Sequence, residues 1–246
     1  MPDTPPPALT AHAVSKRFGG LVAINDISFA LAENEVLGLI GPNGSGKTTM
    51  MNLISGALRP SAGEIRLYGD DLARIGPSRI ANKGIARTFQ LVRMLPGLTV
   101  LENVAAGGVF GHARRWGKEL DDYAHGLLQR VGLPNAGNVA VRALTYIDQK
   151  RVELARALAS DPKVLLLDEW LAGLNPTELK TGIALIEQLR VEGRTIIIVE
   201  HVMHAIRSLC DRCIVMSSGS KIAEGTPREV LADAEVIRAY LGTADA

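Results

Sequence analysis

The sequence predicts an α/β protein with a parallel sheet at its core, antiparallel strands near the N-terminus and a mainly helical insertion. Three observations lead to this prediction. Short, continuously apolar runs such as residues 164–167 are typical of strands that are covered on both faces. A glycine-rich loop follows one such run and precedes a helical pattern. The stretch 95–159 contains several helical patterns and few strand signals.

The expected elements follow from the periodicity along the chain. Residues 9–31 alternate, with Ile27, Phe29 and Leu31 on one face, which indicates antiparallel strands. The other expected strands are short apolar runs at residues 36–40, 65–67, 164–167, 195–199 and 213–216. The expected helices lie at residues 48–57, 100–106, 120–131, 148–159, 177–191, 202–209 and 235–241. Pro162 follows the fourth of these helices and ends it.

The composition excludes several classes of protein. The 246 residues are 47% hydrophobic and 22% charged, which is ordinary for a globular chain and excludes a mostly disordered one. Lys and Arg number 27 against 26 Asp and Glu, a net charge of +1, and aromatic residues make up only 4%. Neither value indicates a nucleic-acid partner or an anionic membrane surface.

No apolar run approaches the ~18–20 residues of a membrane-spanning helix. Residues 1–7 lack the basic and apolar regions of a signal peptide. We therefore expect a soluble intracellular protein that joins a membrane only as a peripheral subunit.

Cys210 and Cys213 have a spacing found in redox and zinc sites. Zinc needs about four ligands, and the nearby His201 has another role below. Because Cys210 closes an apolar helical stretch and Cys213 opens a strand, we favour packing roles for both.

A phosphate-binding loop is the strongest motif in the chain. It matches the pattern G-x-x-x-x-G-K-[ST] at every fixed position and consists of Gly41, Pro42, Asn43, Gly44, Ser45, Gly46, Lys47 and Thr48. Glycines let successive N–H groups converge on phosphate oxygens, and the following helix directs its positive end to the same place. Lys47 supplies a charge for the β- and γ-phosphates, and the Thr48 hydroxyl can bind Mg²⁺. Glycine-rich loops also close ordinary turns, but the strand before this loop and the helix after it favour nucleotide binding.

Two carboxylates, Asp168 and Glu169, end the apolar run 164–167. Acids at the end of a strand are often merely solvated. Ligands of parallel sheets, however, lie beyond the carboxyl ends of the strands, where the phosphate loop also lies. We therefore expect Asp168 to hold Mg²⁺ and Glu169 to polarise the attacking water as a general base.

The phosphate loop and these carboxylates, with the segments between and after them, resemble the ATP-binding subunit of ABC transporters over residues 9–242. The resemblance implies a P-loop NTPase (RecA-like) core with an N-terminal antiparallel β subdomain and an inserted α-helical subdomain. It divides the chain into a flexible proline-rich tail at 1–8 and one ABC ATPase domain at 9–246, made of core segments 9–90 and 160–233, a helical subdomain 91–159 and a C-terminal helix 234–246.

Further site residues follow from this resemblance. Gln90 aligns with the glutamine that contacts Mg²⁺ and water, and His201 with the histidine that bonds the γ-phosphate and orients the catalytic carboxylate. Phe18 takes the place of an aromatic residue that stacks on adenine, and Thr49 extends the nucleotide-binding loop. Residues 172–175 occupy the position of the D-loop. The expected cofactors are ATP and Mg²⁺, with Thr48, Gln90 and Asp168 around the metal.

The signature segment, which we define as residues 144–148, departs from the family pattern Leu-Ser-Gly-Gly-Gln. It reads Leu144, Thr145, Tyr146, Ile147 and Asp148. Thr145 keeps a hydroxyl for the γ-phosphate, but Ile147 replaces a glycine and Asp148 brings a negative charge close to an anion. We expect both changes to weaken ATP capture. A second departure is Trp170-Leu171, where small residues or proline are more usual.

Family members pair head to tail, so that each signature segment completes the partner's site. The altered segment leads to the hypothesis of a heterodimer with two unequal sites, although a homodimer stays open. Several stretches resemble importers of branched-chain amino acids or of amides and urea, namely residues 18–21, 87–90, 96–104, 172–176 and 237–242. This resemblance implies a second ATPase, two permease subunits and an extracytoplasmic solute-binding protein, with the chain at the cytoplasmic face of the inner membrane.

We expect residues 91–104 to receive the permease, because Met94, Leu95 and Leu98 are more apolar than a solvated loop needs; local core packing is the alternative. Rival functions stay open beside transport of amino acids. The chain could also be a related ATPase of lipopolysaccharide export, and a non-catalytic nucleotide sensor would explain Ile147. A GTPase is disfavoured because residues 82–85 fail the Asn-Lys-x-Asp motif.

Overall fold

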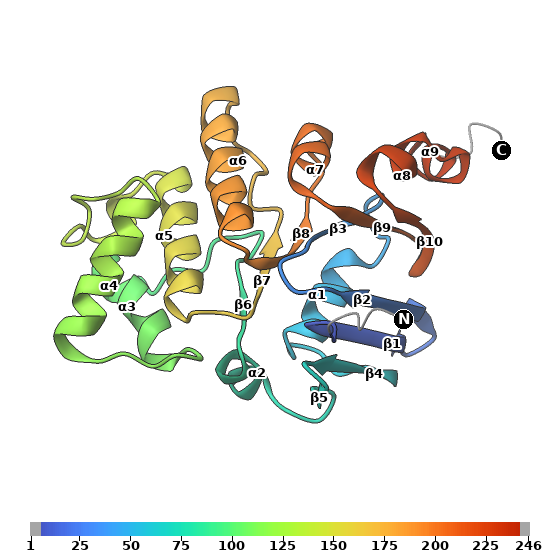
Figure 1. Cartoon of the computed structure of the whole chain (residues 1–246), viewed down its shortest axis with the longest axis horizontal. Coiled ribbons are helices and arrows are strands. Elements are labelled where there is room, and N and C mark those ends of the chain that lie inside the picture. The colour runs from blue at the N-terminus through green and yellow to red at the C-terminus, as the bar shows by residue number, and fades with distance from the viewer. Residues whose placement is uncertain (1–5, 242–246) are drawn as a thin grey trace.

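A six-stranded sheet forms the centre of the structure, a computed structural model that describes residues 6–241 (Figure 1). Its strands, in the order in which they lie side by side, are β10 (Ser220–Gly225), β9 (Arg212–Ser217), β3 (Val36–Ile40), β8 (Thr195–Val199), β7 (Val164–Asp168) and β6 (Ile85–Arg87). The pairs from β9 to β6 are parallel, and β10 pairs antiparallel with β9. The carboxyl ends of β3, β6, β7 and β8 therefore meet at one edge of the sheet.

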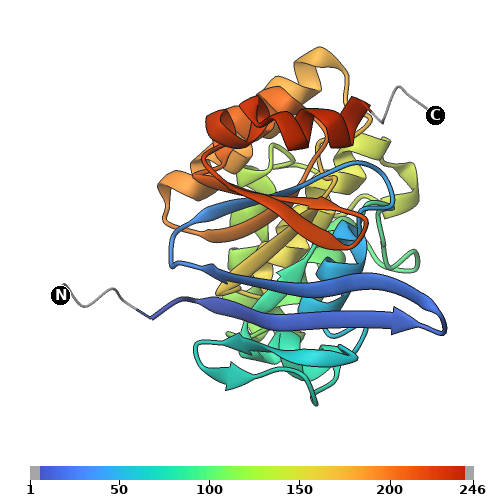
Figure 2. The ribbon, with the colours of Figure 1, turned by 90° about the vertical axis from the view of Figure 1, so that its right-hand side faces the viewer.

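A second, antiparallel sheet lies beside the first. Its strands, again in spatial order, are β2 (Leu21–Leu31), β1 (Leu9–Phe18), β4 (Ala62–Leu67) and β5 (Asp70–Asp71). Figure 2 shows the long strands β1 and β2 side by side. Ile27, Phe29 and Leu31 are all buried, which confirms the face predicted from their alternation.

Helices cover both faces of the central sheet. α1 (Lys47–Ile54) lies between the two sheets, and its methionines Met50 and Met51 are fully buried there. The bounds of the remaining helices are α2 (Pro77–Lys83), α3 (Val100–Phe110), α4 (Gly117–Arg130), α5 (Tyr146–Ala159), α6 (Pro176–Val191), α7 (Met203–Leu209), α8 (Pro227–Ala232) and α9 (Ala234–Leu241), with a short 3₁₀ turn at Val141–Ala143. The other face of the central sheet carries α5, α6 and α7, and α3 and α4 pack with α5 at one end of the molecule (Figure 1).

Burial of the parallel strands on both faces is confirmed by β7. Leu165 and Leu167 belong to the apolar core shared with α5 and α6, whereas Val164 and Leu166 belong to the core that contains α1. Because side chains alternate across a strand, a continuous apolar run is needed to fill both cores.

Five helices and strands within residues 6–241 lie outside the predicted set: α2, β5, β6, α8 and β10. β5 has only two residues, β6 three and α8 six, too few to show a period, and β10 is rich in polar residues. Cys210 and Cys213 are both buried and not disulfide-bonded, as the packing prediction requires. Within residues 6–241, no helix combines the length and apolar character that a membrane span requires. Residues 1–5 of the predicted tail and 242–246 of the predicted C-terminal segment lie outside the described residues.

Candidate nucleotide-binding site

The loop between β3 and α1 has a backbone that only its glycines allow. Gly41 has φ 147°, and a Cβ on it would lie 2.1 Å from the carbonyl oxygen of Met216. Gly46 has φ 105° and comes directly before α1. Lys47 Nζ donates to the carbonyl oxygens of Gly41 at 2.8 Å and Pro42 at 2.9 Å. Burial lowers the pKa of Lys47, and the charges of Glu169 and Asp168 act against this shift.

A cavity of about 550 Å³ opens beside this loop. Phe18 is 45% exposed at the cavity and offers a ring face to a base. Gly41 and Pro42 hold Lys47 rather than line the cavity. The predicted binding residues that line it are Phe18, Asn43, Gly44, Ser45, Gly46, Lys47, Thr48 and Thr49, and the predicted catalytic residue Glu169 lines it too. The cavity therefore joins an aromatic surface, a ring of backbone amides and one ammonium group, which suits a nucleoside phosphate.

Three predicted catalytic side chains meet beyond the strand ends. Glu169 follows β7, and its Oε2 accepts a hydrogen bond from Gln90 Nε2 at 2.7 Å. Its Oε1 lies 3.1 Å from Nε2 of His201, which follows β8. Glu169 has φ +49°, a left-handed backbone that is rare for a non-glycine residue and typical of functional positions. The arrangement holds a carboxylate between an amide and an imidazole at the mouth of the phosphate loop.

Asp168 lies one residue before this carboxylate and is 2% exposed. Its Oδ2 pairs with Arg87 Nη2 at 2.6 Å, and its buried Oδ1 has no hydrogen-bond partner among the described residues. Asp168 lines a small cavity of about 210 Å³ together with Thr48 and Gln90. Carboxylate, hydroxyl and amide oxygens are the ligands that Mg²⁺ prefers, so these residues fit that ion.

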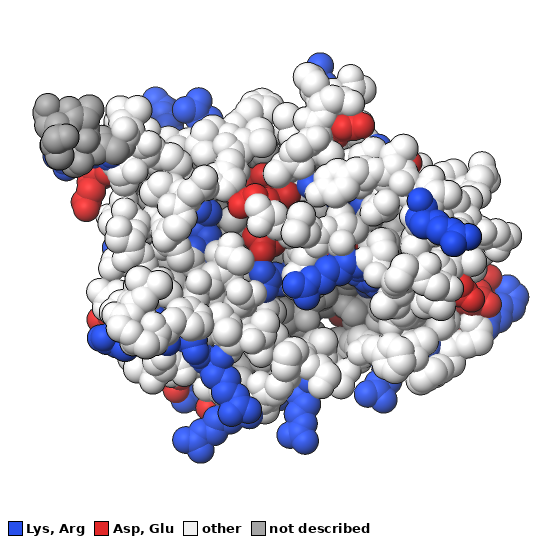
Figure 3. All heavy atoms as spheres, turned by 180° about the vertical axis from the view of Figure 1, so that it is seen from behind, with Lys and Arg blue, Asp and Glu red and all other residues white. Residues whose placement is uncertain are grey.

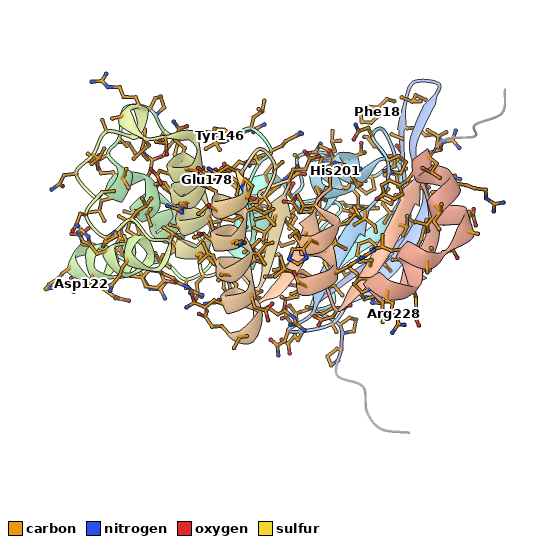
Figure 4. The ribbon with its side chains drawn as sticks, turned by 90° about the horizontal axis from the view of Figure 1, so that it is seen from above. Phe18, Asp122, Tyr146, Glu178, His201 and Arg228 are labelled. Atoms are coloured by element: carbon orange, nitrogen blue, oxygen red, sulfur yellow. The ribbon has the colours of Figure 1, made fainter. Side chains whose placement is uncertain are left out.

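The signature segment does not line the 550 Å³ nucleotide cavity. Thr145 caps α5, its hydroxyl donates to Asp148 Oδ2 at 2.8 Å, and Asp148 also pairs with Arg151 at 3.2 Å. Leu144 and Ile147 are half-buried, and the described residues that line the nucleotide cavity include none of 144–148. Figure 4 shows Tyr146 on the same face of the molecule as Phe18 and His201 but displaced along it.

Figure 3 looks onto this face, where acidic side chains gather near the centre and are bordered by Lys and Arg. The Thr145 hydroxyl is hydrogen-bonded within the signature segment. That segment lies on the same surface as the nucleotide cavity.

Buried charges beneath the site escaped the sequence reasoning. Lys150 is 1% exposed, and its Nζ donates to the carbonyl oxygens of Ala172 at 2.6 Å, Trp170 at 2.9 Å and Glu169 at 3.3 Å. The indole of Trp170 donates back to the carbonyl oxygen of Lys150 at 3.1 Å. The unusual Trp170 is therefore part of a two-way link between α5 and the segment that follows the catalytic carboxylate.

Glu153 makes a similar link to the other side of the site. Its carboxylate accepts from the N–H groups of Phe89 at 3.2 Å and Arg93 at 3.0 Å, on either side of Gln90. Burial raises the pKa of Glu153, with these hydrogen bonds acting against it. A sequence signal exists, because Lys150 and Glu153 share the helix face of Leu154, Ala157 and Leu158, and charges on an apolar face are unusual.

We expect the buried Glu200, which precedes His201, to give the protein a pH-dependent stability. Burial raises the pKa of Glu200 to about 7, with the Leu171 N–H and the Lys150 charge opposing. Between about 4.5 and about 7 the folded protein then binds more protons than the unfolded chain, so the free energy of unfolding falls as pH rises through that window. In urea denaturation from pH 5 to pH 8, we expect the free energy of unfolding of Glu200→Gln to fall less with rising pH than that of the wild type. The exposed substitution Glu235→Gln is the control, and equal slopes in wild type and Glu200→Gln would contradict the assignment.

Comparisons with known proteins find related ATP-binding subunits of transporters. A family model described as ABC transporter matches residues 24–172, and one described as Branched-chain amino acid ATP-binding cassette transporter matches residues 220–246. The High-affinity branched-chain amino acid transport ATP-binding protein LivG of Salmonella typhimurium is 40% identical over 97% of this chain and 99% of its own length. The corresponding protein BraF of Pseudomonas aeruginosa is 38% identical over the same shares.

Solved structures show the same fold. A nucleotide-free ATP-binding cassette from an ABC transporter superposes with a TM-score of 0.87 at 29% identity, covering 96% of this chain and 99% of its own. A dimeric cassette in a post-hydrolysis state, bound to ADP and Pi, superposes with a TM-score of 0.81 at 26% identity, covering 89% and 99%. The predicted fold class is confirmed. The model match over more than half of the chain and the near full-length relatives show that this chain belongs to the ABC transporter family, among its ATP-binding ATPase subunits.

Proposed function

We propose that this ATPase powers the uptake of branched-chain amino acids or related amides through a membrane permease. The observation that carries the proposal is the contact of Glu169 with Gln90 and His201 beside the phosphate-loop cavity. The relatives named above, which are branched-chain amino acid transport proteins, support the choice of solute. They favour it over lipopolysaccharide export and over a non-catalytic sensor.

The residues divide the chemistry among them. The adenine stacks on Phe18, and the phosphates lie on the loop amides and Lys47. Glu169 takes the proton of the attacking water, while Gln90 and His201 fix the direction of its carboxylate. When bound at Thr48, Gln90 and Asp168, Mg²⁺ supplies positive charge that offsets the charge on the transferring phosphoryl group.

The proposal includes a second ATPase subunit, paired head to tail. The dimeric solved cassette supports this pairing. So does the position of the signature segment, which lies on the face of the nucleotide cavity without lining it. In such a pair, residues 144–148 of this chain complete the partner's cavity.

The permease would dock in a groove of about 480 Å³ at the junction of α2, β6, α3 and α5. Phe110 and Leu95 line the groove and are 74% and 42% exposed, which is more apolar surface than a solvated groove needs. Of the three apolar residues expected to receive the permease, Leu95 is exposed, whereas Met94 and Leu98 are half-buried and Met94 packs against the apolar core. An extracytoplasmic binding protein and a site at the cytoplasmic face of the membrane complete the proposed assembly.

A change at Ile147 tests the unequal-site hypothesis. We expect Ile147→Gly, assayed in the assembled transporter, to raise ATP turnover about tenfold. Without the isoleucine side chain the backbone can approach the phosphate, and the contact restored in this way is worth about one charged hydrogen bond. Ile147→Val, which keeps a branched side chain, is the matched control. An unchanged rate and an unchanged ATP affinity in Ile147→Gly would count against the hypothesis.

Reconstitution tests the function itself. The chain is co-expressed with the membrane proteins and the second ATPase that co-purify with it, and the complex is placed in proteoliposomes containing ATP. We expect ATP-dependent accumulation of leucine, isoleucine or valine in the presence of the cognate binding protein, and none with Glu169→Gln. ATP hydrolysis that no branched-chain amino acid or amide stimulates would overturn the choice of solute.

A further inference from the structure

Arg87, the last residue of β6, joins three elements around the small cavity beside Thr48. Its side chain is 6% exposed. One guanidinium nitrogen pairs with Asp168 Oδ2 at 2.6 Å, and the other donates to Asn52 Oδ1 on α1 at 2.7 Å and to Oγ of Ser55, the residue after α1, at 3.1 Å. The planar group is therefore held from two sides and cannot turn without breaking bonds to α1 or to β7.

The ion pair with Arg87 gives the two carboxylate oxygens of Asp168 different environments. Oδ2 is committed to Arg87, whereas Oδ1 is buried and has no hydrogen-bond partner among residues 6–241. An unpaired buried polar atom costs about 1–3 kcal/mol, and such an atom in a native site points to a ligand. Asp168, Thr48 and Gln90 line the same cavity of about 210 Å³.

We propose that Arg87 is a positioning residue for the metal of the nucleotide site: it fixes Oδ2 of Asp168 so that Oδ1 is presented to Mg²⁺ beside Thr48. The inference rests on the proposed function, because that function makes Mg²⁺ the ligand of Asp168. Two effects of the guanidinium oppose each other. Its charge repels a cation, but its two-sided attachment holds a buried carboxylate that would otherwise turn toward other donors or admit water. We infer that Mg²⁺ binding gains more from the fixed carboxylate of Asp168 than it loses from repulsion by the guanidinium of Arg87.

Binding of Mn²⁺, a paramagnetic substitute for Mg²⁺, tests this balance without measuring turnover. Free and bound Mn²⁺ are counted by electron paramagnetic resonance in the complex with a non-hydrolysable ATP analogue. We expect Arg87→Gln to weaken Mn²⁺ binding about tenfold, the low end of what loss of an outer partner costs a metal site. Affinity for the analogue in EDTA, which reports the nucleotide cavity alone, should change less than about threefold. Unchanged or tighter Mn²⁺ binding would overturn the inference.

Two further variants keep the test open if Arg87→Gln does not fold. Arg87→Lys retains the charge without the two-sided attachment, and Asn52→Ala removes one support and leaves the ion pair. Both should weaken Mn²⁺ binding in the same direction and by less, whereas normal binding in both would also overturn the inference. Arg130→Gln is the matched control, because Arg130 pairs with Glu192, the residue after α6, lines neither cavity and, like Arg87, has a buried Nε without a partner among the described residues.

Asp168→Asn separates the two layers of the proposal. If Asp168→Asn leaves Mn²⁺ affinity unchanged, the metal assignment in the proposed function fails, and the role of Arg87 fails with it. If Asp168→Asn weakens binding and Arg87→Gln does not, the metal assignment stands and only the positioning role is lost.

Discussion

Glu169→Gln should reduce ATP hydrolysis by about 10²–10⁴-fold, the range that a positioned general base contributes, while ATP binding is retained. The amide has nearly the shape of the carboxylate and can still meet Gln90 and His201, which lie 2.7 Å and 3.1 Å from its oxygens in the wild type. It cannot accept a proton from water at neutral pH. The measurement pairs single-turnover phosphate release with equilibrium binding of a fluorescent ATP analogue.

The exposed substitution Glu119→Gln on α4 is the control, because it makes the same chemical change far from the cavity; its side chain is 75% exposed. We expect its turnover to match the wild type. Hydrolysis by Glu169→Gln within about threefold of the wild type would remove Glu169 from the base role, because loss of a general base costs far more. A parallel loss of nucleotide affinity would instead indicate that Glu169 supports the cavity, for which its charge near Lys47 gives a physical reason.

The parts of the site that sequence alone could predict are those that local chemistry dictates. The phosphate loop is one, because the glycines at 41 and 46, Lys47 and Thr48 must be neighbours in the chain to form it. The carboxylates at the end of β7 are another, since a strand end is visible in the apolar pattern. Gln90 and His201 could be predicted only from the family resemblance. They lie 79 and 32 residues from Glu169 in the sequence, and no local pattern indicates that their loops contact it.

The structure added the buried charges, which no local pattern assigns to a partner. Lys150 and Glu153 appear as unusual charges on an apolar helix face, yet only the fold shows that Lys150 bonds the segment that begins at Glu169 and that Glu153 bonds the loop that carries Gln90. Arg87 reads as an ordinary residue before the Gln90 loop until the parallel pairing of β6 with β7 brings it to Asp168. Trp170 appears in the sequence as a departure from the family pattern, and the structure shows that its indole donates a hydrogen bond to α5.

Lys47→Met should weaken ATP binding by about 10–150-fold, the value of one charged hydrogen bond of ~1.5–3 kcal/mol. In the free protein the Lys47 ammonium bonds the carbonyl oxygens of Gly41 and Pro42, so it is held inside the loop where the phosphates arrive. Methionine fills a similar volume but brings no charge, and it leaves those two carbonyl oxygens without their donor. Part of the effect is therefore a loosened loop, and melting temperature with and without ATP separates that part from the lost phosphate contact.

Lys118→Met is the matched control, because it removes the same charge from an exposed position on α4, where the side chain is 84% exposed. Its ATP affinity should equal that of the wild type. Because the loop amides and the positive end of α1 remain in Lys47→Met, some binding should survive at high ATP. ATP affinity of Lys47→Met within about threefold of the wild type would mean that these backbone groups suffice and that no charged hydrogen bond forms, since such a bond is worth more than that factor. The phosphate contact assigned to the Lys47 ammonium would then fall, and the loop amides that line the 550 Å³ cavity would be the groups that hold the phosphates.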